Sequence, residues 1–159
     1  MFKSTYCTLF LALFGLMAFT YGAEAKSDCD KVSGTGHTLA VGPATFQGIA
    51  NLTLNNTDVI VTVTTNLLGP PTATEDGTLL ATTSHTFVFQ DGSSLTTLDQ
   101  AVLSPTSTPG LYNLNVRASI TGGTGTYDDA CGQLSIHGTI NFLSGEVEWS
   151  VTGRICDCG

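Results

Sequence analysis

The chain has 159 residues, of which 13 are Asp or Glu and 5 are Lys or Arg, so its formal net charge at pH 7 is −8. This length suits one domain with a sizeable core. The acidic balance excludes a basic stripe for nucleic acid, and an anionic membrane surface would repel the chain.

The first predicted element is a signal peptide, residues 1–25. Lys3 precedes the apolar run Leu9–Phe19, and the tripeptide Ala23–Ala25 places small residues at positions −3 and −1 of a signal-peptidase site. Cleavage after the first residue of that tripeptide is the alternative. The apolar run is short for a membrane span, and no later stretch is long enough. We therefore expect residues 26–159 to form a single secreted, extracellular domain that is not in a membrane.

The remainder of the chain has the pattern of an all-β protein. Val, Ile and Thr are abundant, and Gly, Pro, Asn and Asp interrupt the sequence about every ten residues, as in sandwiches and barrels. Eight strands of such length would close an antiparallel, calycin-like barrel, which removes exposed edges. The polar segment Lys26–Gly36 is expected to be irregular. The predicted strands are His37–Val41, Thr45–Leu54, Asp58–Leu67, Thr78–Gln90, Ser94–Leu103, Leu111–Thr121, Gly132–Phe142 and Glu146–Ile155.

Alternation of apolar and polar residues predicts which face of each strand points inward. The segment Ser94–Leu103 has apolar residues at both parities, so its inward face stays open. The pairs Asn55-Asn56 and Asp91-Gly92 tolerate the positive φ of tight hairpin turns. The predicted inward residues are Phe46, Ala50, Leu52, Leu54, Val59, Val61, Val63, Leu79, Ala81, Phe87, Phe89, Tyr112, Leu114, Val116, Ala118, Ile120, Leu134, Ile136, Ile140, Phe142, Val147, Trp149, Val151 and Ile155.

Four cysteines remain after the signal peptide takes Cys7, and an even count in a secreted chain favours two disulfides. A two-residue turn at Ser144-Gly145 would place Cys131 opposite Cys158, with both on the polar face of the last hairpin. A bond between Cys156 and Cys158 would close a very tight ring. We therefore predict Cys131–Cys158 and Cys29–Cys156. Zinc is the alternative, but neither the spacing nor the compartment suits it.

Two glycosylation sequons, Asn51-Leu-Thr53 and Asn55-Asn-Thr57, lie four residues apart. Asn51 and Asn55 both fall on the polar parity of the strand Thr45–Leu54, so both are expected to point to solvent. In a eukaryotic source, we expect one or both to be glycosylated.

Two segments carry a resemblance to a known family. One is ITGGTGTY at Ile120–Tyr127, followed by GQLSIHGTI at Gly132–Ile140 and WSVTGRI at Trp149–Ile155; the other is HTFVFQDGSSL at His85–Leu95. Over roughly Thr78–Ile155 the chain resembles the allene oxide cyclase and dirigent barrel superfamily. The resemblance implies an eight-stranded barrel with an apolar cavity, often in a dimer or trimer, that steers cyclisation or radical coupling of small apolar molecules.

His85 is the candidate catalytic residue, because its parity places an imidazole among inward apolar side chains. The structural alternative is a histidine hydrogen-bonded to a neighbouring strand. The candidate ligand cavity contains Phe87, Phe89, Tyr112 and Trp149, with Thr83 and either Thr96 or Gln100 as further polar inward residues. His137 is expected on the surface, whereas His37 fits either side.

Three functions fit this sequence. In the first, the barrel binds a small apolar molecule and guides its cyclisation, isomerisation or coupling, as an isomerase or cyclase without cofactor or metal. In the second, it only carries the ligand, as lipocalins do. In the third, it is a solid barrel that acts through its outer surface as a matrix or host-interaction protein. An interior with no cavity above about 100 Å3 would favour the third, because small-ligand pockets usually reach roughly 300 Å3.

Overall fold

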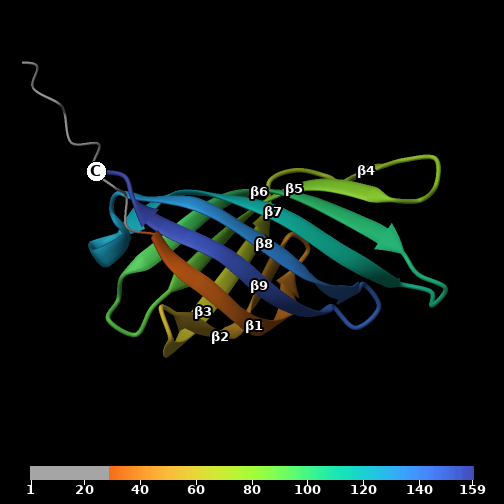
Figure 1. Ribbon diagram of the computed structural model, residues 1–159. Coiled ribbons are helices and arrows are strands. Elements are labelled where there is room, and N and C mark those ends of the chain that lie inside the picture. The colour runs from red at the N-terminus through yellow and green to blue at the C-terminus, as the bar shows by residue number, and fades with distance from the viewer. Residues whose placement is uncertain (1–28) are drawn as a thin grey trace, which may run out of the picture.

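Eight long strands form a closed antiparallel barrel in the computed structural model, which describes residues 29–159 (Figure 1). The strand order is β3-β2-β1-β9-β8-β7-β6-β5, and pairing of β3 with β5 closes the barrel. The predicted fold class is therefore confirmed. The strands are β1 Cys29–Gly42, β2 Thr45–Leu54, β3 Thr57–Leu67, β5 Leu79–Val88, β6 Ser94–Pro105, β7 Leu111–Thr124, β8 Ala130–Asn141 and β9 Glu146–Asp157, with the two-residue β4 Thr72–Ala73 on the edge of β5 and a 3-10 turn η1 at Gly125–Tyr127.

Among the described residues, no helix has the length and hydropathy of a membrane span. The predicted signal peptide lies outside the described residues.

The first strand is longer than the sequence predicted. β1 begins at Cys29 and pairs with both β2 and β9, so the expectation that Lys26–Gly36 is irregular is wrong for its described part. Glycines occupy inward positions of β1 where an apolar side chain would be expected, so the sequence does not show the alternation that is typical of a strand. A Cβ at Gly36 would overlap the indole of Trp149, its partner on β9. The missing side chain therefore makes room for the tryptophan.

The β8–β9 hairpin has a four-residue turn, not the predicted two-residue turn at Ser144-Gly145. Asn141 pairs with Glu146, which shifts the register by two residues. The Asn141 carboxamide oxygen accepts hydrogen bonds from the backbone N–H groups of Leu143 and Ser144, at 2.9 and 3.4 Å. A shift of two preserves every inward and outward assignment on the strands. Phe142, predicted to be inward, belongs to the turn and is 47% exposed.

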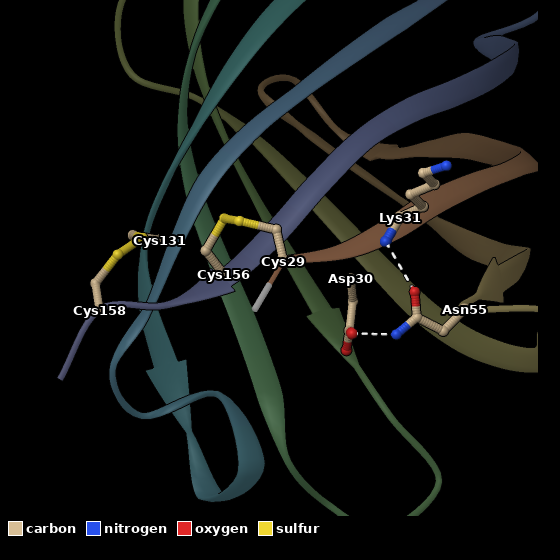
Figure 2. Close-up of a disulfide and its surroundings, with 7 residues drawn as sticks. All are labelled: Cys29, Asp30, Lys31, Asn55, Cys131, Cys156 and Cys158. Carbon is tan, nitrogen blue, oxygen red and sulfur yellow. Dashed lines mark hydrogen bonds between the residues drawn. A yellow bond between two sulfur atoms is a disulfide. The ribbon is translucent and has the colours of Figure 1, made fainter. Parts of the chain in front are cut away.

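Both predicted disulfides are confirmed, and they lie side by side near the end of β9 (Figure 2). Cys29 and Cys156 face each other across β1 and β9, with their Cα atoms 4.1 Å apart. Cys131 is also opposite Cys156, and it bonds instead to Cys158, two residues further along. The pairing was predicted correctly from a register that was two residues off.

The barrel interior is packed at the disulfide end and hollow at the other. At the disulfide end, Phe89 stacks on Tyr127 of η1, with ring centroids 4.4 Å apart. Burial raises the pKa of Tyr127, and the nearby Asp91 and Asp30 carboxylates raise it further. Wholly buried apolar side chains fill the interior between this stack and the hollow half: Val61, Val63, Phe87, Leu95 and Val151, with Ile136 at the border of the hollow.

Candidate functional site

A cavity of about 220 Å3 occupies the half of the barrel opposite the disulfides. Residues of the β1–β2 turn, the β3–β5 loop and the β8–β9 turn surround its mouth, among them Pro43, Pro71 and Phe142. The wall is mainly apolar, and small side chains such as Ala81 and Ala101, which pair across β5 and β6, leave the space unfilled. The interior is therefore not solid in this half.

A buried polar cluster lies at the inner end of the cavity. His85 on β5 is 7% exposed, and Asp99 on β6 is 0% exposed. The His85 Nδ1 atom lies 2.6 Å from the Asp99 Oδ2 atom, and the Thr83 hydroxyl donates to the same oxygen at 3.2 Å. The backbone N–H of His85 donates to the Thr97 hydroxyl at 3.2 Å. All four side chains point inward, among strands that are otherwise apolar on this face.

The cluster fixes which edge of the imidazole is free. The Thr83 hydroxyl donates to the Asp99 Oδ2 atom, so this oxygen is an acceptor and the His85 Nδ1–H donates to it. In the neutral ring the Nε2 atom then carries a lone pair. Among residues 29–159 no hydrogen bond reaches Nε2, while His85 lines the cavity and Asp99 does not. Nε2 is therefore the atom that a cavity ligand can reach.

Asp99 is the part of the cluster that packing alone does not explain. A buried carboxylate is costly unless it is paired and hydrogen-bonded. Asp99 satisfies one oxygen with His85 and Thr83, whereas its Oδ1 atom has no partner among the described residues. The hydrogen bond from His85 to Asp99 orients the imidazole, as the acidic residue does beside the histidine of hydrolase triads.

This arrangement suits proton transfer and hydrogen bonding. In the described part of the chain, no serine hydroxyl or cysteine thiol hydrogen-bonds to His85; the Thr83 hydroxyl donates to Asp99, and the Thr97 hydroxyl accepts the backbone N–H of His85. No group of three His, Cys, Asp or Glu side chains in residues 29–159 is arranged to hold a metal ion.

The predicted aromatic residues occupy different parts of the barrel. Trp149 lines the cavity together with His85. Phe87 packs between them, with its ring centroid 5.9 Å from His85 and 6.5 Å from Trp149. Phe89 lies at the disulfide end of the barrel, where it stacks on Tyr127. Tyr112 contacts Phe142 near the cavity mouth but is not among the lining residues. The outer histidines, His37 and His137, are exposed.

Sequence reasoning missed Asp99 because the face of β6 was unresolved. The expectation that Thr96 or Gln100 points inward is wrong; Thr97 and Asp99 do. A two-residue turn at Asp91-Gly92 would put the even-numbered residues of β6 inside. Phe89 instead accepts the Gly92 N–H and donates to the Ser93 carbonyl, which makes a three-residue turn with Gly92 at φ 84°. One extra turn residue moves the whole opposite face inward.

Comparison with known proteins gives structural neighbours only. No protein-family model matches the chain, and no curated protein does. Among solved structures, the pterocarpan synthase dirigent protein GePTS1 is similar with a TM-score of 0.47 and 14% identity, over 82% of this chain and 91% of that one. The pterocarpan synthase dirigent protein PsPTS1 gives a TM-score of 0.45 and 13% identity, over 82% and 96%. Both of these structures are described as dirigent proteins.

Proposed function

We propose that the barrel binds one small, mainly apolar molecule that carries a hydroxyl group, and guides its cyclisation, isomerisation or coupling. The observation that supports this proposal is the buried His85–Asp99 pair at the end of an apolar cavity. Aliphatic side chains in this space would serve stability at least as well, because a buried polar pair is seldom more stabilising than well-packed apolar residues of similar volume. Convergent polar groups in an apolar pocket are typical of ligand sites.

The chemistry follows from the free nitrogen. The ligand hydroxyl donates a hydrogen bond to the Nε2 atom of His85, and the proton moves to that nitrogen as negative charge develops on the ligand oxygen. Asp99 stabilises the resulting imidazolium, and the proton returns to the product, so no electrons are gained or lost. For coupling, the cavity holds and orients one of two radicals that are formed elsewhere, and the second radical joins it at the cavity mouth. Orientation alone can lower a barrier by about 7–11 kcal/mol in favourable cases.

The volume restricts the ligand to about one substituted ring. An engineered apolar cavity of about 150 Å3 in another protein holds benzene, whereas pockets for drug-sized molecules begin at about 300 Å3. The present cavity, at about 220 Å3, lies between these sizes.

The test uses phenol and toluene, which have similar shapes and differ in the hydroxyl group. Trp149 is the only tryptophan in the chain and lines the cavity, so its fluorescence reports binding. We expect both probes to bind and phenol to bind about 2- to 10-fold more tightly, the worth of one hydrogen bond. His85→Leu should remove that preference, whereas His37→Leu on the outer surface should not. Absence of binding by both probes at millimolar concentration would refute the proposal.

Secretion and self-association belong to the same proposal. The two disulfides fit a secreted protein.

A surface role is the second candidate function, and the observation that favours it is an apolar patch on the outer face of β5 and β6: Leu80, Leu98 and Val102 are 44%, 47% and 38% exposed. If this patch joins copies of the chain, light scattering should give the mass of a dimer or trimer for the wild type. The triple variant Leu80→Ser, Leu98→Ser and Val102→Ser should give the mass of a monomer.

A further inference from the structure

The two sequons occupy different surroundings in the folded protein. Asn51 lies on the outward face of β2, and Asn55 lies in the two-residue turn between β2 and β3. Both are exposed. Glycosylation replaces one hydrogen on the side-chain nitrogen of the asparagine, so the partners of that nitrogen distinguish the two positions.

Asn55 is tied into the fold by its side chain and its backbone (Figure 2). Its Nδ2 atom donates to the Asp30 carboxylate, and its Oδ1 atom accepts the backbone N–H of Lys31 at 3.2 Å. Its own backbone N–H donates to the Lys31 carbonyl at 3.1 Å. These bonds fasten the β2–β3 turn to the start of β1, next to Cys29. A sugar on Nδ2 would crowd this contact.

Asn51 has the opposite character. Within residues 29–159 no hydrogen bond reaches its side chain, which stands at the border of a hollow of about 580 Å3 on the outer surface of β2, β1, β9 and β8. Most of its wall consists of outward side chains of the four strands, and only Trp149 borders both this hollow and the interior cavity. A sugar on Asn51 would displace no hydrogen bond of the protein.

The hollow contains two cross-strand rows of side chains. The first row runs from Asn51 through Thr35 and Ser150 to His137, and the second runs from Ile49 through His37 and Glu148 to Thr139. Three strand spacings separate the ends of each row, about 14 Å. Hydroxyl, imidazole and carboxylate groups here can hydrogen-bond sugar hydroxyls and acetamides, and the 57% exposed Ile49 offers an apolar contact.

We propose that Asn51, and not Asn55, carries the N-linked glycan, and that its inner N-acetylglucosamine residues lie in this outer hollow. The Asn51 side-chain nitrogen bonds to C1 of an oligosaccharide carried on a lipid pyrophosphate; the bond from C1 to the pyrophosphate oxygen breaks, and the nitrogen loses one proton. The glycan then covers the outer face of β1 and β9 and leaves the mouth of the interior cavity open.

The site is tested by secreting the full chain from a eukaryotic host and mapping the glycan by peptide mass spectrometry. Asn51→Gln should remove all glycan mass. Asn55→Gln should keep the full glycan and lower the melting temperature, because it loses the contact with Asp30. Glycan on Asn55, or on neither asparagine, would overturn the proposal.

The position of the sugars is tested by histidine modification with diethylpyrocarbonate. In protein trimmed to the first N-acetylglucosamine residues, His37 and His137 should react severalfold more slowly than in Asn51→Gln. The buried His85 serves as the internal control and should react equally in both. A glycan on Asn51 that leaves both outer histidines equally reactive would refute its placement in the hollow.

Discussion

Replacing Asp99 by Val tests whether the buried polar cluster exists for chemistry or for stability. The substitution strands the His85 Nδ1–H, which lies behind the cavity wall, at a cost of about 1–3 kcal/mol for an unsatisfied buried donor. The Thr83 hydroxyl also loses its acceptor but lines the cavity, so only the net value of one hydrogen bond is lost, about 0.5–1.5 kcal/mol. Asp99→Val should therefore destabilise the protein by about 1.5–4.5 kcal/mol.

The double variant His85→Leu with Asp99→Val gives the contrasting result. It removes both members of the pair, so no charge or donor is stranded between them, and we expect its stability to return to within about 1 kcal/mol of the wild type. The same variant should lose the preference for phenol over toluene. Stability recovered together with recognition lost would mean that the pair serves the ligand.

The free energy of unfolding of the wild type, of Asp99→Val and of the double variant is measured by urea unfolding at pH 7 under non-reducing conditions, followed by Trp149 fluorescence. Asp58→Val is the matched control, because Asp58 accepts a hydrogen bond from Thr53 at the exposed surface and its loss should cost less than about 0.5 kcal/mol. Asp99→Val as stable as this control would refute the hydrogen-bonded cluster. A double variant no more stable than Asp99→Val would show that the pair is a structural requirement.

Three further results are expected. Gly36→Ala should destabilise the barrel by about 1–3 kcal/mol and shift the tryptophan emission, whereas Gly42→Ala, where a Cβ meets no atom within 4 Å, should be neutral in the same urea titration. Ala101→Leu should fill part of the cavity and abolish phenol binding in calorimetry, with the melting temperature unchanged or raised; retained phenol affinity would place the ligand elsewhere. Hydrogen bonds from Ser93 lower the pKa of Asp91 below its ordinary value of 3.8. The stability that these hydrogen bonds contribute is therefore present above pH 3.8 and is lost as the pH falls through the lowered pKa of Asp91 in the folded protein. In Ser93→Ala, NMR titration should find the Asp91 pKa moved up toward 3.8.

Strand number and inward faces were predictable because alternation with a period of two depends only on local parity. That is why an error of two residues at the β8–β9 turn left the inward positions of Trp149 and Val151 unchanged. The start of β1 was not predictable, because Gly34 and Gly36 are inward residues without side chains. Their position makes sense only beside Trp149 and Leu52, which occupy the space that a Cβ would need.

The site was predictable only in part, for a related reason. The inward position of His85 was predictable because β5 alternates clearly between buried inward residues and more exposed outward ones. The inward position of Asp99 was not predictable, because the polar residues at the centre of β6 that point inward have the pattern of a solvent-exposed face. Its position depends on a one-residue difference in the β5–β6 turn, and odd shifts of register, unlike even ones, exchange the faces of a strand.

The placement of these features along the barrel axis accounts for their coexistence. The disulfides, the Asn55 contact with β1 and the Phe89–Tyr127 stack all lie at one end of the barrel. These covalent and non-covalent contacts stabilise the barrel from that end. The opposite half can then keep an unfilled cavity and a carboxylate with one unpartnered oxygen, both of which cost stability. Conditions that selectively loosen the packed end, such as reduction of the disulfides, should therefore lower the melting temperature of the whole barrel while leaving the phenol affinity of the folded fraction unchanged.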